Sequence, residues 1–123
     1  MIYLAVALAG GMGAISRFLM DTWVRSLLKS EFPWGIFVVN ISGSLALGIV
    51  AGMASVSGMS EVLIIALTTG FLGAYTTFSG WMVQSLQLME AKAWVYAMFN
   101  IFASIISGIL ATAAGLYAVF WLV

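Results

Sequence analysis

The sequence has no cysteine, no histidine and a single proline among its 123 residues, and only 7% of the chain is charged. The absence of cysteine excludes a disulfide framework and a thiolate metal site. The absence of histidine removes the usual transition-metal ligand and the side chain best suited to acid–base chemistry near neutral pH. Since roughly a quarter of the residues in a soluble domain are charged, this composition argues strongly against a water-soluble monomer.

The few charges divide the chain into four uncharged stretches. These stretches cover 1–16, 32–60, 62–89 and 93–123, and they contain 16, 29, 28 and 31 residues. A bilayer core about 30 Å thick is crossed by roughly 20 residues of helix. The first stretch suffices if its helix carries Arg17 at the end, because a guanidinium group can extend to the interface. We therefore expect an all-α membrane protein, with one four-helix transmembrane domain over residues 1–123 and spans near 2–28, 33–55, 62–89 and 93–121.

Four charged residues follow the first stretch at intervals of four positions: Arg17, Asp21, Arg25 and Lys29. Residues four apart lie on one face of a helix, so the first helix is expected to leave the membrane as a charged extension. One interpretation is an interfacial ladder in which Asp21 pairs with both arginines. In the other interpretation, Arg17 faces a water-filled entrance. Pro33 suits the first turn of a helix and marks the start of the second span.

The middle of the third stretch, residues 69–81, is unusual for a membrane helix. It consists of Thr-Gly-Phe-Leu-Gly-Ala-Tyr-Thr-Thr-Phe-Ser-Gly-Trp, with three glycines and four threonine or serine residues. A backbone that leaves the helix in hydrocarbon loses its hydrogen bonds, so it is tolerated only where protein or a polar cavity surrounds it. We therefore expect the third helix to be broken near its middle. The alternative is an unbroken helix whose glycines serve packing and whose hydroxyl groups bond to the preceding turn.

The carboxylates are few and lie at expected helix ends or in loops: Asp21, Glu31, Glu61 and Glu90. No pair of them is placed for general acid–base catalysis, and no nucleophile has a base beside it. The sequence also has no phosphate-binding loop, metal-ligand cluster or basic tract. We therefore predict that the chain is not an enzyme.

Neutral polar residues, by contrast, fall inside the expected spans. Asn40 lies seven positions after Pro33, about 10 Å into the second helix, where an amide needs a partner or water. In the fourth helix, amide, hydroxyl and small residues recur every three or four positions, at Asn100, Ser104, Gly108, Thr112 and Gly115. Such residues serve either interhelical packing and hydrogen bonding or a polar pathway, and the sequence leaves both uses open.

A set of side chains without fixed charge is thus available to line a pathway. Its members are Asn40, Thr76, Thr77, Ser79, Asn100 and Ser104, with Phe78 and Trp81 beside them. Neutral donors replace part of the hydration shell of a small ion without holding it as tightly as a buried arginine, which is what conduction requires. The edges of aromatic rings add weak positive potential. Such a lining favours an anion.

Three motifs resemble the Fluc (CrcB) family of fluoride channels in bacterial membranes. They are Gly-Gly-Met-Gly-Ala-Ile-Ser-Arg at 10–17, Pro-Trp-Gly-Ile-Phe-Val-Val-Asn at 33–40 followed by Ser42 and Gly43, and Thr-Gly-Phe-Leu-Gly-Ala-Tyr-Thr-Thr-Phe-Ser at 69–79. The third motif is the most specific. With the chain length and the four spans, the resemblance covers the whole protein. It implies a fluoride-selective channel for passive fluoride export across the bacterial inner membrane, which lowers cytoplasmic fluoride.

The resemblance also implies an assembly and a set of sites. The assembly is an antiparallel, dual-topology dimer in the lipid bilayer, in which the broken third helices of two subunits cross at the centre. A structural sodium ion is held there by backbone carbonyls, which the motif assigns to Gly73 and Thr76. The anion pore is formed by Asn40, Thr77, Phe78, Ser79, Trp81, Asn100 and Ser104, and Arg17 lies in the vestibule. We expect Gly73→Val to damage assembly and flux, by blocking a backbone geometry that only glycine adopts easily.

The chain departs from the family pattern at two places. The family usually continues Thr-Phe-Ser-Thr-Phe where this sequence has Thr-Phe-Ser-Gly-Trp at 77–81. Asn100 stands where an aromatic or imidazole side chain is common. Gly80, Trp81 and Asn100 are therefore the positions at which this subunit differs from the pattern.

Two other functions stay open from the sequence. A proton-coupled small multidrug exporter also has four short helices, but it needs a carboxylate in the first span, and residues 1–16 contain none. A non-conducting membrane subunit of a larger complex would use its asparagines and threonines as interhelical contacts. Flux from the purified chain separates the second alternative from a channel.

The basic residues are distributed unevenly between the two sides of the expected membrane domain. Arg17, Arg25, Lys29 and Lys92 fall on the side of the first and third connections, and no basic residue falls on the side of the second connection and the termini. Basic residues favour the cytoplasmic side. We therefore expect a preferred orientation with both termini outside, and a partner subunit that is either an identical copy or an oppositely oriented paralogue.

Overall fold

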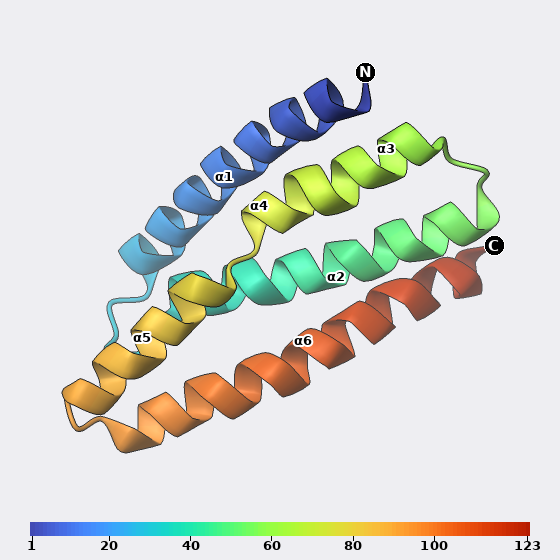
Figure 1. The fold of residues 1–123 in the computed structure, drawn as a ribbon. Helices are drawn as coiled ribbons and strands as arrows, with labels where there is room; N and C mark the ends of the chain where they lie inside the picture. Colours follow the sequence, from blue (N-terminus) through green and yellow to red (C-terminus); the bar gives the residue numbers. More distant parts are fainter.

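The computed structural model describes all 123 residues, and every regular element is a helix (Figure 1). Three spans are continuous: α1 (Ile2–Leu27), α2 (Trp34–Val56) and α6 (Trp94–Leu122). The remaining span consists of α3 (Glu61–Ile65), a π-helical segment η1 (Ala66–Leu72), α4 (Gly73–Tyr75) and α5 (Phe78–Glu90). All four spans are long and apolar enough to cross a membrane. The prediction of an all-α protein with four spanning helices is confirmed.

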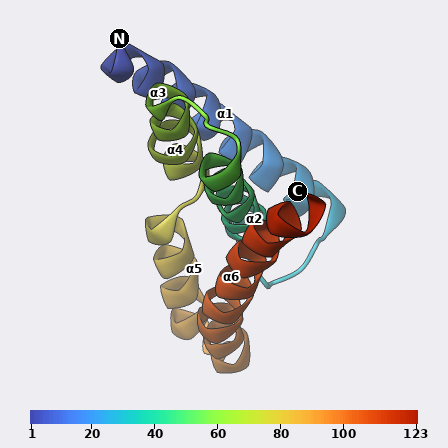
Figure 2. The same cartoon turned by 90° about the vertical axis from the view of Figure 1, so that its right-hand side faces the viewer.

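The third span is broken at Thr76 and Thr77. Both residues are extended, with φ and ψ of −75° and 156° at Thr76 and of −146° and 118° at Thr77. The break redirects the chain, because α3, η1 and α4 pack along α1 whereas α5 packs along α6 (Figures 1 and 2). The prediction that the third helix is broken near its middle is therefore confirmed.

Glycines bring α2 and α6 into backbone contact. A Cβ atom on Gly48 would collide with the Thr112 carbonyl, and one on Gly115 would collide with the Leu45 carbonyl. The Thr112 hydroxyl also donates to the Ser44 carbonyl at 3.1 Å. Thr112 and Gly115, in the C-terminal half of α6, therefore serve packing against α2.

The first half of the third span is held from two sides. A Cβ atom on Gly13 of α1 would collide with the Phe71 carbonyl, so α1 and η1 also meet at their backbones. From α2, the Ser42 hydroxyl lies 2.9 Å from the Tyr75 hydroxyl, within hydrogen-bond distance. These contacts fix the end of α4, and therefore the start of the break, between α1 and α2.

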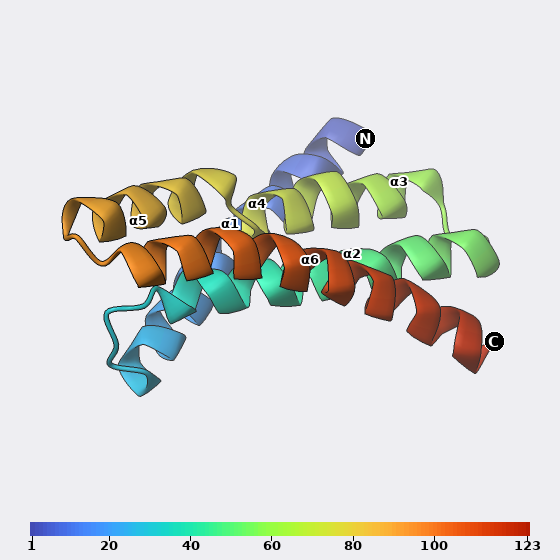
Figure 3. The same ribbon diagram turned by 90° about the horizontal axis from the view of Figure 1, so that it is seen from below.

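The connections and termini gather at two ends of the molecule. Both termini and the α2–α3 connection lie at one end, and the α1–α2 and α5–α6 connections lie at the other (Figures 1 and 3). Only 18 of the 123 residues are buried, and large apolar side chains are exposed along α1 and α6. Apolar surface of this extent needs hydrocarbon or another protein as its surroundings. The chain is a multi-pass membrane protein.

Candidate functional site

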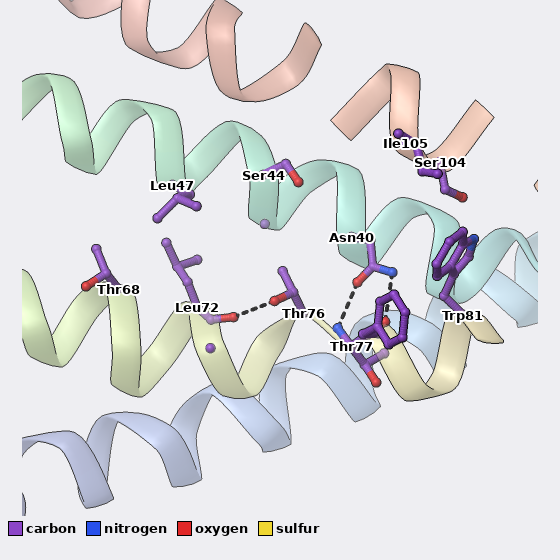
Figure 4. A pocket seen from close by; sticks show the side chains of 13 residues that line it. Asn40, Ser44, Leu47, Thr68, Leu72, Thr76, Thr77, Trp81, Ser104 and Ile105 are labelled. Carbon is purple, nitrogen blue, oxygen red and sulfur yellow. Dashed lines mark hydrogen bonds between the residues drawn. The ribbon is translucent and has the colours of Figure 1, made fainter. Parts of the chain in front are cut away.

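A cavity of about 330 Å³ lies beside the break in the third span (Figure 4). Its walls come from α2, η1, α4, α5 and α6 and from the two extended residues between α4 and α5. Seven of the predicted site residues line it: Asn40, Gly73, Thr76, Thr77, Phe78, Trp81 and Ser104. The other three, Arg17, Ser79 and Asn100, do not. The fold thus gathers most of the predicted residues, from three of the four spans, around one cavity.

Asn40 on α2 binds the backbone of the break. Its side-chain nitrogen donates to the Thr77 carbonyl at 3.0 Å, and its side-chain oxygen accepts the Thr77 N–H at 2.8 Å (Figure 4). The amide thereby replaces both backbone partners that Thr77 loses when the helix is interrupted. Asn40 is therefore a clamp for the break as well as part of the cavity wall.

The break also exposes the N-terminal end of α5. Thr77 caps this helix, since its hydroxyl accepts the Gly80 N–H at 3.1 Å and lies 3.3 Å from the Ser79 hydroxyl. The N–H groups of Phe78 and Ser79, in the first turn, have no carbonyl partner within α5. Because a helix N-terminus carries positive potential, this end of α5 favours an anion beside the break.

On the opposite side of the break, α4 ends in carbonyl groups without helical partners. In a continuous helix the Thr77 N–H would bond to the Gly73 carbonyl, but here it bonds to Asn40. The Thr76 carbonyl accepts no backbone hydrogen bond. Such oxygens are suitable ligands for a hard cation, and the chain has no cluster of acidic, histidine or cysteine side chains that would bind metal elsewhere. The carbonyl oxygens of Gly73 and Thr76 therefore fit a hard cation such as sodium.

The expectation that Gly73 needs a glycine-specific backbone geometry is wrong. Its φ and ψ are −62° and −32°, which is ordinary α-helical geometry that any residue adopts. A Cβ atom at Gly73 would have a single neighbour within 4 Å, the Thr68 carbonyl at 3.5 Å. The glycine instead keeps the cavity wall open beside the free carbonyls.

Phe78 and Trp81 form the aromatic part of the cavity wall. Their ring centroids lie 5.2 Å apart with the planes at 61°, a tilted arrangement that aromatic pairs favour. The Phe78 side chain is 73% exposed. An aromatic ring presented in this way is available to an ion, to lipid or to a second subunit.

Asn100 and Ser85 form a buried polar pair between α6 and α5. Each is 1% exposed, and Asn100 Nδ2 donates to Ser85 Oγ at 2.9 Å. The backbone carbonyl of Asn100 accepts a hydrogen bond from Trp81 Nε1–H at 3.0 Å. The sequence identified Asn100 and not Ser85, whose one sequence feature is its position a single turn after Trp81 on the same helix.

The charged residues of α1 form one ion pair. Arg25 Nε lies 2.9 Å from Asp21 Oδ1, whereas Arg17 is partly buried and takes part in no ion pair. The interpretation in which Asp21 pairs with both arginines is therefore wrong. The vestibule role of Arg17 stays a prediction.

Known proteins are similar in sequence to this chain over most of its length. Residues 4–116 match the family described as CrcB-like protein, Camphor Resistance (CrcB). The fluoride-specific ion channel FluC 2 of Mycobacterium tuberculosis is 40% identical over 114 residues, which cover 93% of this chain and 87% of that protein. FluC 2 of Clostridium acetobutylicum is 41% identical over 108 residues, or 88% of this chain and 89% of that channel. FluC 4 of Brucella abortus is 38% identical over 120 residues, or 95% and 90%.

Proposed function

The chain belongs to the CrcB family, and we propose that it is a fluoride-selective channel through which fluoride leaves the bacterial cytoplasm passively across the inner membrane. The observation that carries the proposal is the break at Thr76 and Thr77 beside a cavity of about 330 Å³. Interrupted backbone at membrane depth is tolerated only within protein or beside a polar cavity. The names of the similar channels supply the identity of the ion.

The chemistry of the cavity suits a small, strongly hydrated anion. The hydroxyl groups of Thr77 and Ser104 and the N-terminal end of α5 offer donors that replace part of the hydration shell. The edge of the Phe78 ring adds weak positive potential. None of these groups carries a full charge, so the ion is not held as tightly as it would be at a buried arginine.

We further propose that the working unit is an antiparallel dimer of two such chains in the lipid bilayer. Gly73 and Phe78 lie on the cavity wall and are both exposed in the single chain. The family resemblance implies that a second subunit packs against this surface. The Gly73 and Thr76 carbonyls of two chains would together hold a sodium ion. That ion would supply fixed positive charge at the centre of the dimer.

Flux through reconstituted protein tests the proposed function. The purified full chain is placed in liposomes loaded with potassium fluoride or potassium chloride, and efflux is started with valinomycin and followed with ion-selective electrodes. We expect fluoride efflux well above that of protein-free liposomes, with no chloride efflux. Equal chloride and fluoride flux contradicts a selective channel, and the absence of both contradicts conduction by this chain and favours a non-conducting subunit.

A further inference from the structure

Trp81, Ser85 and Asn100 are joined by a closed loop of hydrogen bonds between α5 and α6. Trp81 Nε1 donates to the backbone carbonyl of Asn100 at 3.0 Å, and the side-chain nitrogen of Asn100, Nδ2, donates to Ser85 Oγ at 2.9 Å. Ser85 Oγ then donates to the Trp81 carbonyl at 2.8 Å. The loop therefore begins and ends on Trp81. Its two other members are buried, so water does not compete for these bonds, and the bonds are strengthened by the low local dielectric.

Trp81 is the one member of the loop that reaches the cavity. It lines the wall with Phe78, and Ser85 and Asn100 do not line it. Ser85 therefore reaches the cavity through Trp81, whereas Asn100 has a second neighbour in the wall, because its Oδ1 lies 3.5 Å from the Ser104 hydroxyl. Ser85, which has no bond to Ser104, is therefore the residue at which the role of Trp81 can be tested.

The direction of the indole N–H decides how Trp81 interacts with an anion. An indole nitrogen is a donor only, and a small, partly dehydrated anion accepts hydrogen bonds strongly. Conduction requires binding weak enough for the ion to leave. The loop turns the N–H of Trp81 toward the α6 backbone, which leaves only the carbon-bound hydrogens of the ring for the cavity.

We propose that Ser85 and Asn100 are positioning residues: the bond between their side chains fixes α6 against α5, so that the Asn100 backbone carbonyl holds the Trp81 N–H away from a passing anion. In this role Asn100 positions Trp81 and does not line the ion pathway, in contrast to the pore role that was expected from the sequence. The inference rests on the proposed fluoride conduction. It also accounts for the presence of Asn100 and Ser85 beside a tryptophan, because a phenylalanine at position 81 would have no N–H that needs to be held.

A pair of variants tests the inference by flux. Ser85→Ala removes the acceptor of the Asn100 amide and opens the loop. We expect it to slow fluoride efflux about fivefold, the effect of one additional hydrogen bond on a bound ion. In a Trp81→Phe background the same Ser85→Ala change is expected to have no effect. Ser107→Ala is the matched control, since the Ser107 hydroxyl also bonds back to the preceding turn, at Ala103, and lies off the cavity.

A spectroscopic measurement tests the same inference by a readout that does not depend on flux. The indole ¹H–¹⁵N resonance of Trp81 is assigned by its loss in Trp81→Phe. In the unsubstituted channel, fluoride is expected to leave this resonance unmoved and its proton slow to exchange. In Ser85→Ala, fluoride is expected to shift the resonance, and in Ser107→Ala it is not.

Three results would overturn the inference. One is a shift of the Trp81 resonance by fluoride in the unsubstituted channel. Another is unchanged flux in Ser85→Ala, and the third is an equal slowing by Ser85→Ala in the Trp81→Phe background. Failure of the proposed function is a separate outcome, because an unsubstituted chain without fluoride flux contradicts the channel while exchange of the indole proton, measured without fluoride, still tests the loop.

Discussion

Asn40→Ala is expected to destabilise the broken third span and to lower flux. The substitution removes both hydrogen bonds between α2 and the break, of 3.0 Å to the Thr77 carbonyl and 2.8 Å from the Thr77 N–H. No other side chain or backbone group donates to or accepts from these two atoms. Thr77 would then carry an unpaired N–H and C=O at membrane depth.

The structure sets limits on the size of this effect. Interhelical hydrogen bonds in membranes contribute about 0.6 kcal/mol each, so the loss of two bonds costs at least about 1 kcal/mol. Two dry, unpaired backbone groups cost about 1–3 kcal/mol each, which sets an upper limit of about 6 kcal/mol. Thr77 lines a cavity of about 330 Å³, which is large enough to admit water beside both groups. We therefore expect a loss of about 2 kcal/mol, toward the lower limit.

Reversible unfolding in mixed micelles, with increasing mole fraction of dodecyl sulfate, measures the free energy of unfolding. Hydrogen exchange at the Thr77 amide reports the same site directly. Ser44→Ala is the matched control, because Ser44 lies one turn after Asn40 on α2 and lines the same cavity. Its hydroxyl makes no hydrogen bond, and its one bond to another helix is made by its backbone carbonyl, which the substitution keeps, to the Thr112 hydroxyl. We expect Ser44→Ala to leave both measurements close to those of the unsubstituted protein.

The reasoning is refuted if Asn40→Ala changes the free energy of unfolding no more than Ser44→Ala does. It is also refuted if the Thr77 amide exchanges no faster in Asn40→Ala than in the unsubstituted chain. Either result would mean that the break is held by its neighbours in α4 and α5 and that Asn40 serves the cavity alone.

Four further predictions concern packing, the dimer and orientation. Gly48→Ala forces α2 and α6 apart and should lower the free energy of unfolding by about 1–3 kcal/mol, whereas Gly11→Ala meets no atom within 4 Å and should not. Gly73→Val should leave the subunit helical by circular dichroism, because the backbone at Gly73 is ordinary α-helix. It should reduce the amount of crosslinked dimer, because the valine side chain would project from the cavity wall where the second subunit is proposed to bind. Thr76→Ser should keep assembly and fluoride flux, since the proposed contribution of Thr76 is its carbonyl. A C-terminal reporter fusion should be active mainly outside the cytoplasm, and equal activity on both sides contradicts the orientation inferred from the basic residues.

The spans and the existence of the break were predictable because both depend on local composition. Uncharged stretches of membrane length leave few alternatives to helices. Glycine and hydroxyl residues concentrated in the middle of one stretch indicated that a regular helix is weakest there. The exact place of the break, at Thr76 and Thr77, is set by Thr77 as the cap of α5 and by its pairing with Asn40.

The roles of individual polar residues were less predictable, because they depend on partners distant in the sequence. Asn40 and Thr77 are 37 positions apart, and no local pattern indicates that the amide binds backbone. Ser85 resembles any helical serine that bonds to the preceding turn until Asn100 is placed beside it. The requirement for Gly73 was assigned to backbone conformation, and only the helical φ and ψ together with the open space around the residue show otherwise.

The break lets a chain whose cavity wall has no charged residue present both signs of potential beside one cavity. Interrupting a single helix frees carbonyls at the end of α4 and N–H groups at the start of α5, only two residues apart. The carbonyl end suits a fixed cation and the N–H end suits a mobile anion. Between the two ends, Thr77 would be left without backbone partners in hydrocarbon, and Asn40 supplies both. One neutral amide on a neighbouring helix therefore accounts for how a strongly apolar sequence sustains a polar centre.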